Sequence, residues 1–125
     1  TMRRTIRMMS REAVSLVLFP EGKLHRPPSI LPFGRAIEVL AKRVPNVAMA
    51  PVSILYQMSL HERPEVWISV GRNHSFESIA DCESRLQAEL SGLTEAISVD
   101  SPFSQLSQGS PDINERMSLK RFAKP

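Results

Sequence analysis

The feature that most constrains this chain is a continuous apolar run, Val14-Ser-Leu-Val-Leu-Phe19, which stops abruptly at Pro20-Glu21-Gly22. Apart from Ser15, every side chain in the run is large and apolar, so neither face of an extended segment would be polar. Runs of this kind are typical of strands that are covered on both faces, as in parallel sheets. The run therefore predicts a buried strand over 14–19 with a neighbouring strand on each side.

Five further segments show a helical or a strand-like pattern. They are predicted helices over 2–12, 33–44 and 76–98 and predicted strands over 47–54 and 65–71. The strand over 47–54 contains Pro51, which favours a strand end or a bulge over a central position. The strand over 65–71 follows a short polar connection, so we expect it to pair antiparallel with its predecessor, and we expect Ser75 to be the N-cap of the last helix.

The order of these elements predicts an α/β fold with a sheet of about three strands flanked by helices. Such a sheet is thin for a strand with two apolar faces, which suggests that the fold is partial and that something is missing on its N-terminal side. Residues 1–98 are expected to form one domain. Residues 99–125 are rich in Ser, Pro, Gln and Gly, and this composition predicts a mostly disordered tail.

Composition and charge narrow the classes of function. The 125 residues carry a formal charge of +3, which suits a phosphate-bearing ligand or an anionic membrane surface. Nucleic-acid binding is disfavoured because there is only one Trp and one Tyr and no interleaving of aromatic and basic residues. The single Cys82 excludes an internal disulfide, and no apolar run approaches the roughly 20 residues needed to span a bilayer. We expect a cytoplasmic protein, with peripheral contact to the inner face of a membrane as an option.

The end of the first apolar run is the best candidate for a functional site. In open α/β sheets, ligands bind beyond the carboxyl ends of the strands. Glu21 stands at such an end, and Lys23, His25 and Arg26 follow it. A carboxylate beside basic side chains can orient a polyol or help to hold a phosphate. The alternative is that Glu21 only caps a turn or pairs with Lys23 on the surface.

The block Phe19-Pro20-Glu21-Gly22 has a distinctive context. A Pro32-Phe33 pair and a predicted helix follow it, and then an apolar strand that contains Ala50-Pro51-Val52. With this context, the block resembles the FPEG block of the PlsC-like lysophospholipid and glycerol-phosphate acyltransferases. The resemblance covers roughly residues 11–72, about half of the chain.

The resemblance implies transfer of a fatty acyl group from acyl-CoA or an acyl carrier protein to a hydroxyl of a lysophospholipid or glycerol phosphate. The donor is a substrate, and neither a cofactor nor a metal is implied. Carried over to this sequence, the acceptor is bound by Glu21 and nearby basic residues, while Pro20 and Gly22 shape the turn beside Phe19. Pro51 and Val52 would have a supporting or acyl-binding role.

Two departures from the family pattern limit this reading. The family usually has Thr-Arg-Ser after the block, whereas this chain has Lys23-Leu24-His25 and places Arg26 one position late. Lys23 or Arg26 would have to take the place of the family's phosphate-contacting arginine, and the acceptor need not be glycerol 3-phosphate.

The second departure concerns the family's catalytic His-x-x-x-x-Asp pair, in which the His is the general base and the Asp orients it. The three histidines and the residues five positions after them are His25 and Ile30, His61 and Val66, and His74 and Ile79. The chain therefore lacks the pair, and it resembles a C-terminal, acceptor-binding portion that is inactive alone. A non-catalytic remnant that binds phospholipid or acyl chains is the alternative, and a His-x-x-x-x-Asp block upstream of Thr1 would distinguish the two.

Overall fold

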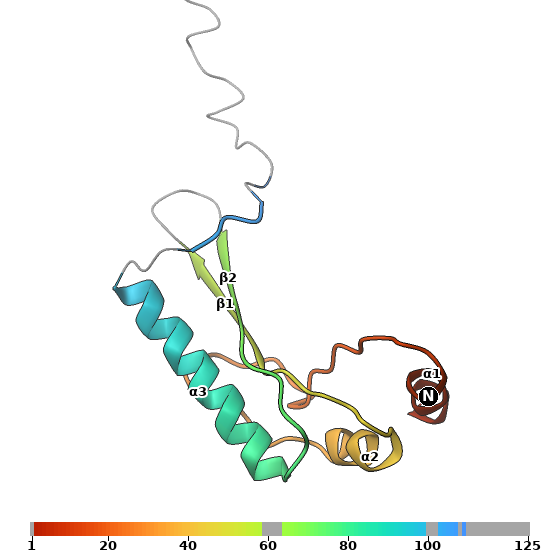
Figure 1. The fold of residues 1–125 in the computed structure, drawn as a ribbon. Helices are drawn as coiled ribbons and strands as arrows, with labels where there is room; N and C mark the ends of the chain where they lie inside the picture. Colours follow the sequence, from red (N-terminus) through yellow and green to blue (C-terminus); the bar gives the residue numbers. More distant parts are fainter. Residues whose placement is uncertain (1, 59–63, 100–102, 108, 110–125) are drawn as a thin grey trace, which may run out of the picture.

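The computed structural model describes residues 2–58, 64–99, 103–107 and 109. It is a small α/β fold with three helices and a two-stranded antiparallel sheet in this part of the chain. The elements are α1 (Met2–Arg11), α2 (Ala36–Arg43), β1 (Val52–Met58), β2 (Pro64–Val70) and α3 (Ile79–Ser98). Figure 1 shows two arms: α3 lies along the β1–β2 hairpin in one, and α1 and α2 lie in the other.

The hairpin brings together two segments that alternate in burial. Its register pairs Val52 with Val70 and Leu55 with Trp67. The predicted strand over 65–71 and its antiparallel pairing are therefore confirmed, with bounds shifted by one residue. The strand predicted over 47–54 begins later, at Val52, and continues to Met58. Pro51 lies just before it, as expected for a residue that cannot donate to a ladder.

The core is small and lies mainly along α3 and α2. Its buried side chains are Leu40, Val44, Cys82, Leu90 and Leu93. Because successive strand residues point to opposite faces, the hairpin turns one face to α3, and no other described element covers the opposite face. Helix α3 supplies three of these buried side chains, Cys82, Leu90 and Leu93.

Helix α3 begins three residues later than the sequence suggested. Ser78, and not Ser75, is its N-cap: the Ser78 side chain accepts a hydrogen bond from the backbone N–H of Asp81, at 3.0 Å. This is the Ser-x-x-acid spacing of a helix start. Helices α1 and α2 also lie within their predicted ranges of 2–12 and 33–44: α1 begins as predicted and ends one residue early, and α2 is shortened at both ends.

The prediction of a buried strand over 14–19 is wrong. Residues 13–19 have no regular secondary structure, and residues 14–19 are all exposed. The most exposed are Val17, at 80%, and Phe19, at 74%. A strand requires a hydrogen-bonded neighbour, and no other segment of the described chain pairs with this one. For the same reason the sheet has two strands here and not three.

The predicted tail over 99–125 lies largely outside the described residues. Where it is described, residues 103–107 have no regular secondary structure, and the Phe103 ring packs against Trp67 with the ring centroids 4.6 Å apart. Trp67 is half-buried on β2.

Candidate functional site

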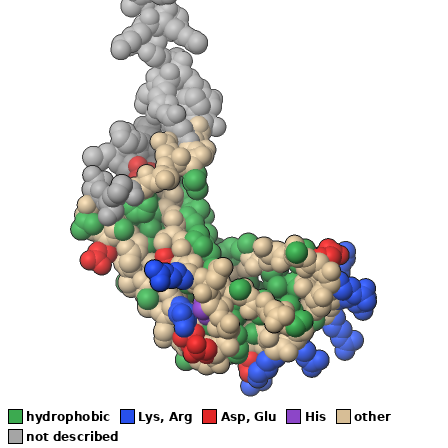
Figure 2. All heavy atoms as spheres, viewed as in Figure 1, with side chains coloured by type: hydrophobic (Ala, Val, Ile, Leu, Met, Phe, Trp, Pro, Cys, Tyr) green, Lys and Arg blue, Asp and Glu red, His purple; other side chains and the backbone are tan. Residues whose placement is uncertain are grey.

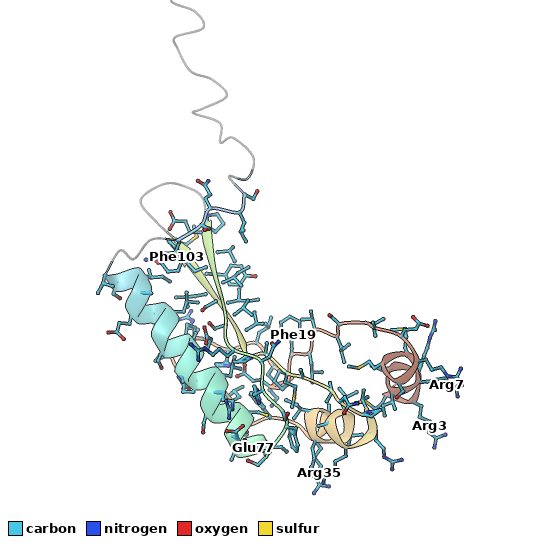
Figure 3. The ribbon with its side chains drawn as sticks, viewed as in Figure 1. Arg3, Arg7, Phe19, Arg35, Glu77 and Phe103 are labelled. Carbon is cyan, nitrogen blue, oxygen red and sulfur yellow. The ribbon has the colours of Figure 1, made fainter. Side chains whose placement is uncertain are left out.

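The Phe19–Gly22 block forms a tight turn. The backbone N–H of Gly22 donates to the carbonyl oxygen of Phe19 at 3.3 Å, which closes a four-residue turn. Gly22 has a φ of +66°, in the left-handed region where glycine avoids the penalty of a Cβ. The expected role of Gly22 in shaping a turn is confirmed. Figure 3 shows Phe19 at the corner where the two arms meet.

The Glu21 carboxylate is the centre of this loop. Its Oε2 accepts a hydrogen bond from the backbone N–H of Leu31 at 2.6 Å, and the same oxygen contacts Nε2 of His25. The Glu21 and His25 side chains are 20% and 25% exposed. Glu21 therefore closes the loop that follows it, and it does not pair with Lys23 as the surface alternative had it.

His25 is held between two acceptors. Its Nε2 faces the Glu21 carboxylate, and its Nδ1 lies 3.1 Å from the carbonyl oxygen of Arg26. An imidazole can satisfy two acceptors only when both ring nitrogens carry a proton. The hydrogen bond to Glu21 and then the one to the Arg26 carbonyl raise the pKa of His25 above its usual 6.5. This arrangement favours a positively charged His25 beside Glu21.

The remaining basic residues of the loop point to solvent. Lys23 and Arg26 are exposed. Their side chains make no hydrogen bond or ion pair with other residues of the described chain. The loop therefore carries one held carboxylate, Glu21, and two exposed cations, Lys23 and Arg26, so an anionic or polyhydroxylated ligand would find both signs of charge on the same loop.

Helix α3 fixes the far side of the loop through two side chains. Gln87 accepts from the backbone N–H of Ile30 at 3.0 Å and donates to the carbonyl oxygen of Pro28 at 2.9 Å. Glu83 accepts from the backbone N–H of Phe33 at 2.7 Å. A hydrogen bond of 2.9 Å from Gly34 N–H to the Pro20 carbonyl closes the loop on itself. The loop is therefore tied at both ends despite its prolines.

Sequence reasoning missed Gln87 and Glu83. They lie one turn apart on the helix, and that spacing was the only signal in the sequence. A shallow depression lies beside them between the loop and α3. It is lined by Ile30, Glu83, Ser84, Gln87, Ala88 and Ser91.

The structure gives Pro51 and Val52 a different neighbourhood. The Pro51 carbonyl accepts from Gly71 N–H at 2.9 Å, where the hairpin begins and ends, and Val52 opens β1 with 45% of its surface exposed. Within the described residues, no hydrogen bond joins either of them to the 20–34 loop. Their expected supporting role therefore stays a prediction.

A second cluster of polar side chains lies at the start of α3. His74, Asp81 and Cys82 each place one ligand-type atom within 4.8 Å of the others. The place of His74 in a connection beside polar residues predicts a plain surface histidine, but its side chain is only 9% exposed, so that prediction is wrong. Asp81 already accepts a hydrogen bond from Arg85 Nε at 2.8 Å, and burial raises the pKa of the Cys82 thiol. A cation would have to displace Arg85, so we assign no metal to this cluster.

None of the described helices is both long enough and apolar enough to cross a membrane. Comparison of the chain with models of protein families, with curated proteins and with solved structures found no match.

Proposed function

We propose that this chain is the acceptor-binding portion of a PlsC-like acyltransferase. The reaction is transfer of an acyl group from acyl-CoA or an acyl carrier protein to a hydroxyl of a lysophospholipid or glycerol phosphate. Support comes from the resemblance of the Phe19–Gly22 block and its context, and from one observation: the Glu21 carboxylate is held by the Leu31 N–H and by His25, in a loop that also carries the exposed Lys23 and Arg26.

The proposed roles follow from charge and exposure. Lys23 and Arg26 are free to bind the phosphate of the acceptor, because charge-assisted hydrogen bonds to phosphate are strong. Glu21 acts as a positioning residue: it holds the loop through Leu31 and His25, so that the cations meet the acceptor in one geometry. The general base must come from the His-x-x-x-x-Asp pair, which this sequence lacks.

The first test is acyl transfer with purified protein, acyl-CoA and a mixture of lysophosphatidic acid and lysophospholipids. We expect no turnover from the 125-residue chain, since it has no His-x-x-x-x-Asp pair. Robust turnover by this chain would contradict the assignment, because one of its own histidines would then be the base.

The second test uses Glu21 variants in a version of the protein extended upstream of Thr1. We expect Glu21→Ala to lower kcat/KM by about 10²-fold, the scale that follows from a misplaced substrate. Glu21→Gln removes the charge but keeps an oxygen that can accept from the Leu31 N–H. It therefore separates the effect of the charge from the effect of the hydrogen bond that closes the loop. Glu38→Ala is the matched control, since Glu38 pairs with Lys42 on α2, outside this loop. Normal transfer by both Glu21 variants would exclude the acceptor-site role.

A binding protein without catalysis is the second candidate, and α1 favours it. Arg3, Arg4, Arg7 and Arg11 are all exposed on this helix, and each basic residue near an anionic membrane contributes about 1 kcal/mol of attraction. This candidate predicts that the chain binds vesicles of anionic phospholipid and that the upstream-extended protein shows no acyl transfer at all. Transfer by the extended protein would rule it out.

A further inference from the structure

The two faces of the β1–β2 hairpin carry apolar and polar side chains in the reverse of the usual arrangement. The face toward α3 combines Leu55 and Trp67 with Ser53, Glu65 and Ser69. The opposite face, which we call the outer hairpin face, consists of Val52, Ile54, Tyr56, Met58, Val66, Ile68 and Val70, each 40–73% exposed. An antiparallel sheet with one solvated face normally turns its apolar side to the core and its polar side to water. The reversed arrangement is expected where a second layer covers the outer hairpin face.

Polar groups on the α3 side of the hairpin are buried at a cost in free energy. Ser53 is 3% exposed, and within the described residues neither its hydroxyl nor the Trp67 indole N–H has a hydrogen-bond partner. The Ser69 hydroxyl donates to the Glu89 carboxylate of α3. A buried polar group without a partner costs about 1–3 kcal/mol. The hairpin thus buries polar groups against α3 while its most apolar face meets water, and a layer on that face would offset the cost.

Charge narrows what the covering layer can be. Glu65 is the only charged residue among the described residues of the two strands, and it lies on the α3 side. An apolar surface that enters an anionic membrane is normally flanked by Lys and Arg. Figure 2 shows hydrophobic side chains along the hairpin, and Lys and Arg gathered at the far end of the arm that holds α1 and α2. An uncharged apolar surface is complementary to itself, so a second copy of this chain fits it.

The register of the hairpin suits a two-fold interface. Outer residues lie opposite each other in three cross-strand pairs, Val52 with Val70, Ile54 with Ile68 and Tyr56 with Val66. Both strands therefore present large apolar side chains at matching positions, with the Ile54–Ile68 pair in the middle. In a two-fold dimer the same patch of each copy meets the other, and stacked sheets interdigitate the side chains of their inner faces.

The area of the face also suffices for a dimer. At roughly 150–200 Å² for a fully exposed large side chain, the exposed fractions of the seven residues correspond to on the order of 600 Å² per copy. Two copies would bury about 1,200 Å², which exceeds the roughly 1,000 Å² expected of a specific interface. A single apolar patch of this size is at the upper end of what monomers expose.

We propose that two copies of this chain form a two-fold dimer in which their outer hairpin faces pack on each other. Each hairpin then lies between its own α3 and the hairpin of the other copy, so both of its faces are covered. A two-stranded hairpin needs such packing, because it is marginally stable alone. No residue of the 20–34 loop belongs to the outer hairpin face, so the dimer is independent of the proposed acyl transfer.

The test is sedimentation of the purified 125-residue chain in an analytical ultracentrifuge, over concentrations from about 1 μM to about 1 mM. We expect a single step from monomer to dimer in this range. A mixture of isotope-labelled and unlabelled chains should also give nuclear Overhauser effects between copies for the methyl groups of Ile54 and Ile68. A chain that stays monomeric throughout would overturn the proposal, as would a mass that grows beyond the dimer.

Three lysine substitutions locate the interface. Ile54→Lys and Ile68→Lys place a charge in the middle of the outer hairpin face, and each should raise the dissociation constant by at least about 30-fold, the scale of a central interface residue. Leu24→Lys is the matched control: Leu24 is fully exposed in the loop, so the constant should change by less than about twofold. Circular dichroism checks that each variant is folded, and the contacts between unsubstituted copies decide the question if a variant unfolds. Equal constants for all three variants would contradict the proposal.

Other occupants of the outer hairpin face give different results, and each of them overturns the proposal. A monomer in which the Ile68 methyl groups contact residues 110–125 would assign the face to the chain's own C-terminal segment. A monomer that binds phosphatidylglycerol vesicles, and binds them less tightly as Ile68→Lys, would assign the face to lipid. A dimer that is weakened by Val17→Lys and not by Ile68→Lys would place the interface on residues 14–19.

Discussion

Two regions carry large apolar side chains but use them differently: the hairpin with α3, and residues 14–19 (the open segment) with the loop that follows them. In the first region, the strands pair with each other and one of their faces packs on α3, where Leu90 and Leu93 are buried. In the second, Val17 and Phe19 are exposed and the backbone between them is unpaired. The difference shows that an apolar sequence becomes a strand only where a neighbour can satisfy its backbone.

The 20–34 loop is intermediate between these two regions. It has no helix or strand, yet its backbone N–H groups at Ile30, Leu31 and Phe33 are each bound by a side chain. Those acceptors are Glu21 and two residues of α3, so the loop takes its shape from the stable region. For this reason the loop that carries the candidate site has a defined shape, although the preceding residues 14–19 have no regular secondary structure.

The largest effect is expected for truncation of a buried leucine, compared with the same truncation at an exposed leucine. Leu93→Ala should lower the free energy of unfolding by about 2–5 kcal/mol, because Leu93 is 3% exposed and its loss leaves a cavity. Leu24→Ala, the same change at a fully exposed leucine of the loop, should shift it by less than about 0.5 kcal/mol. Urea unfolding followed by circular dichroism measures both, and equal losses would contradict the contrast between the regions.

A pair of glycine substitutions tests packing inside the stable region. A Cβ at Gly71 would lie 2.6 Å from Glu89 Oε2 and 2.7 Å from Pro51 Cγ, so Gly71→Ala should destabilise by about 1–3 kcal/mol. Gly92 lies within α3 with no atom within 4 Å of an added Cβ, so Gly92→Ala should stabilise by about 0.5–1 kcal/mol. Thermal unfolding of the two variants should therefore move Tm in opposite directions; a stabilising Gly71→Ala would refute the close approach.

The smallest expected effect is a dependence on pH confined to the loop. Since its contacts with Glu21 and the Arg26 carbonyl raise the pKa of His25, the stabilisation from protonated His25 is complete below about pH 6.5 and is lost as pH rises through the raised value. NMR titration of the His25 ring should give a pKa above 6.5 in this chain and a value closer to 6.5 in Glu21→Gln. A His25 pKa that is the same in both proteins would show that Glu21 does not hold the imidazole.

The parts of this fold that follow from local patterns were predictable from the sequence. The strand-like pattern over 65–71 predicted β2, and the helical pattern over 76–98 predicted α3, in which Leu90 and Leu93 are buried. The prediction of a strand over 14–19 was wrong because an apolar run shows only that the side chains are suited to burial. It does not show whether a neighbouring strand is present to pair with the backbone. Side-chain contacts to the loop were out of reach for a related reason: Gln87 meets Ile30 across 57 positions, with no periodicity to mark the pair.

The same limit applied to the candidate site. The Phe19–Gly22 turn and the nearby cations could be read from the sequence, since they are contiguous. The contact of Glu21 with Leu31 and the burial of His74 beside Asp81 depend on how the loops are folded. A carboxylate that looked free to bind a ligand is thus already bound to its own loop through one oxygen.

Amide hydrogen exchange across the 125-residue chain tests the central contrast most directly. We expect the amides of residues 15–18 to exchange at nearly the rate of an unfolded peptide, while the hydrogen-bonded amides of α3 around Leu90 and of the β1–β2 ladder exchange orders of magnitude more slowly. Protection of residues 15–18 equal to that of the hairpin would contradict the account, because the open segment would then already have its partner.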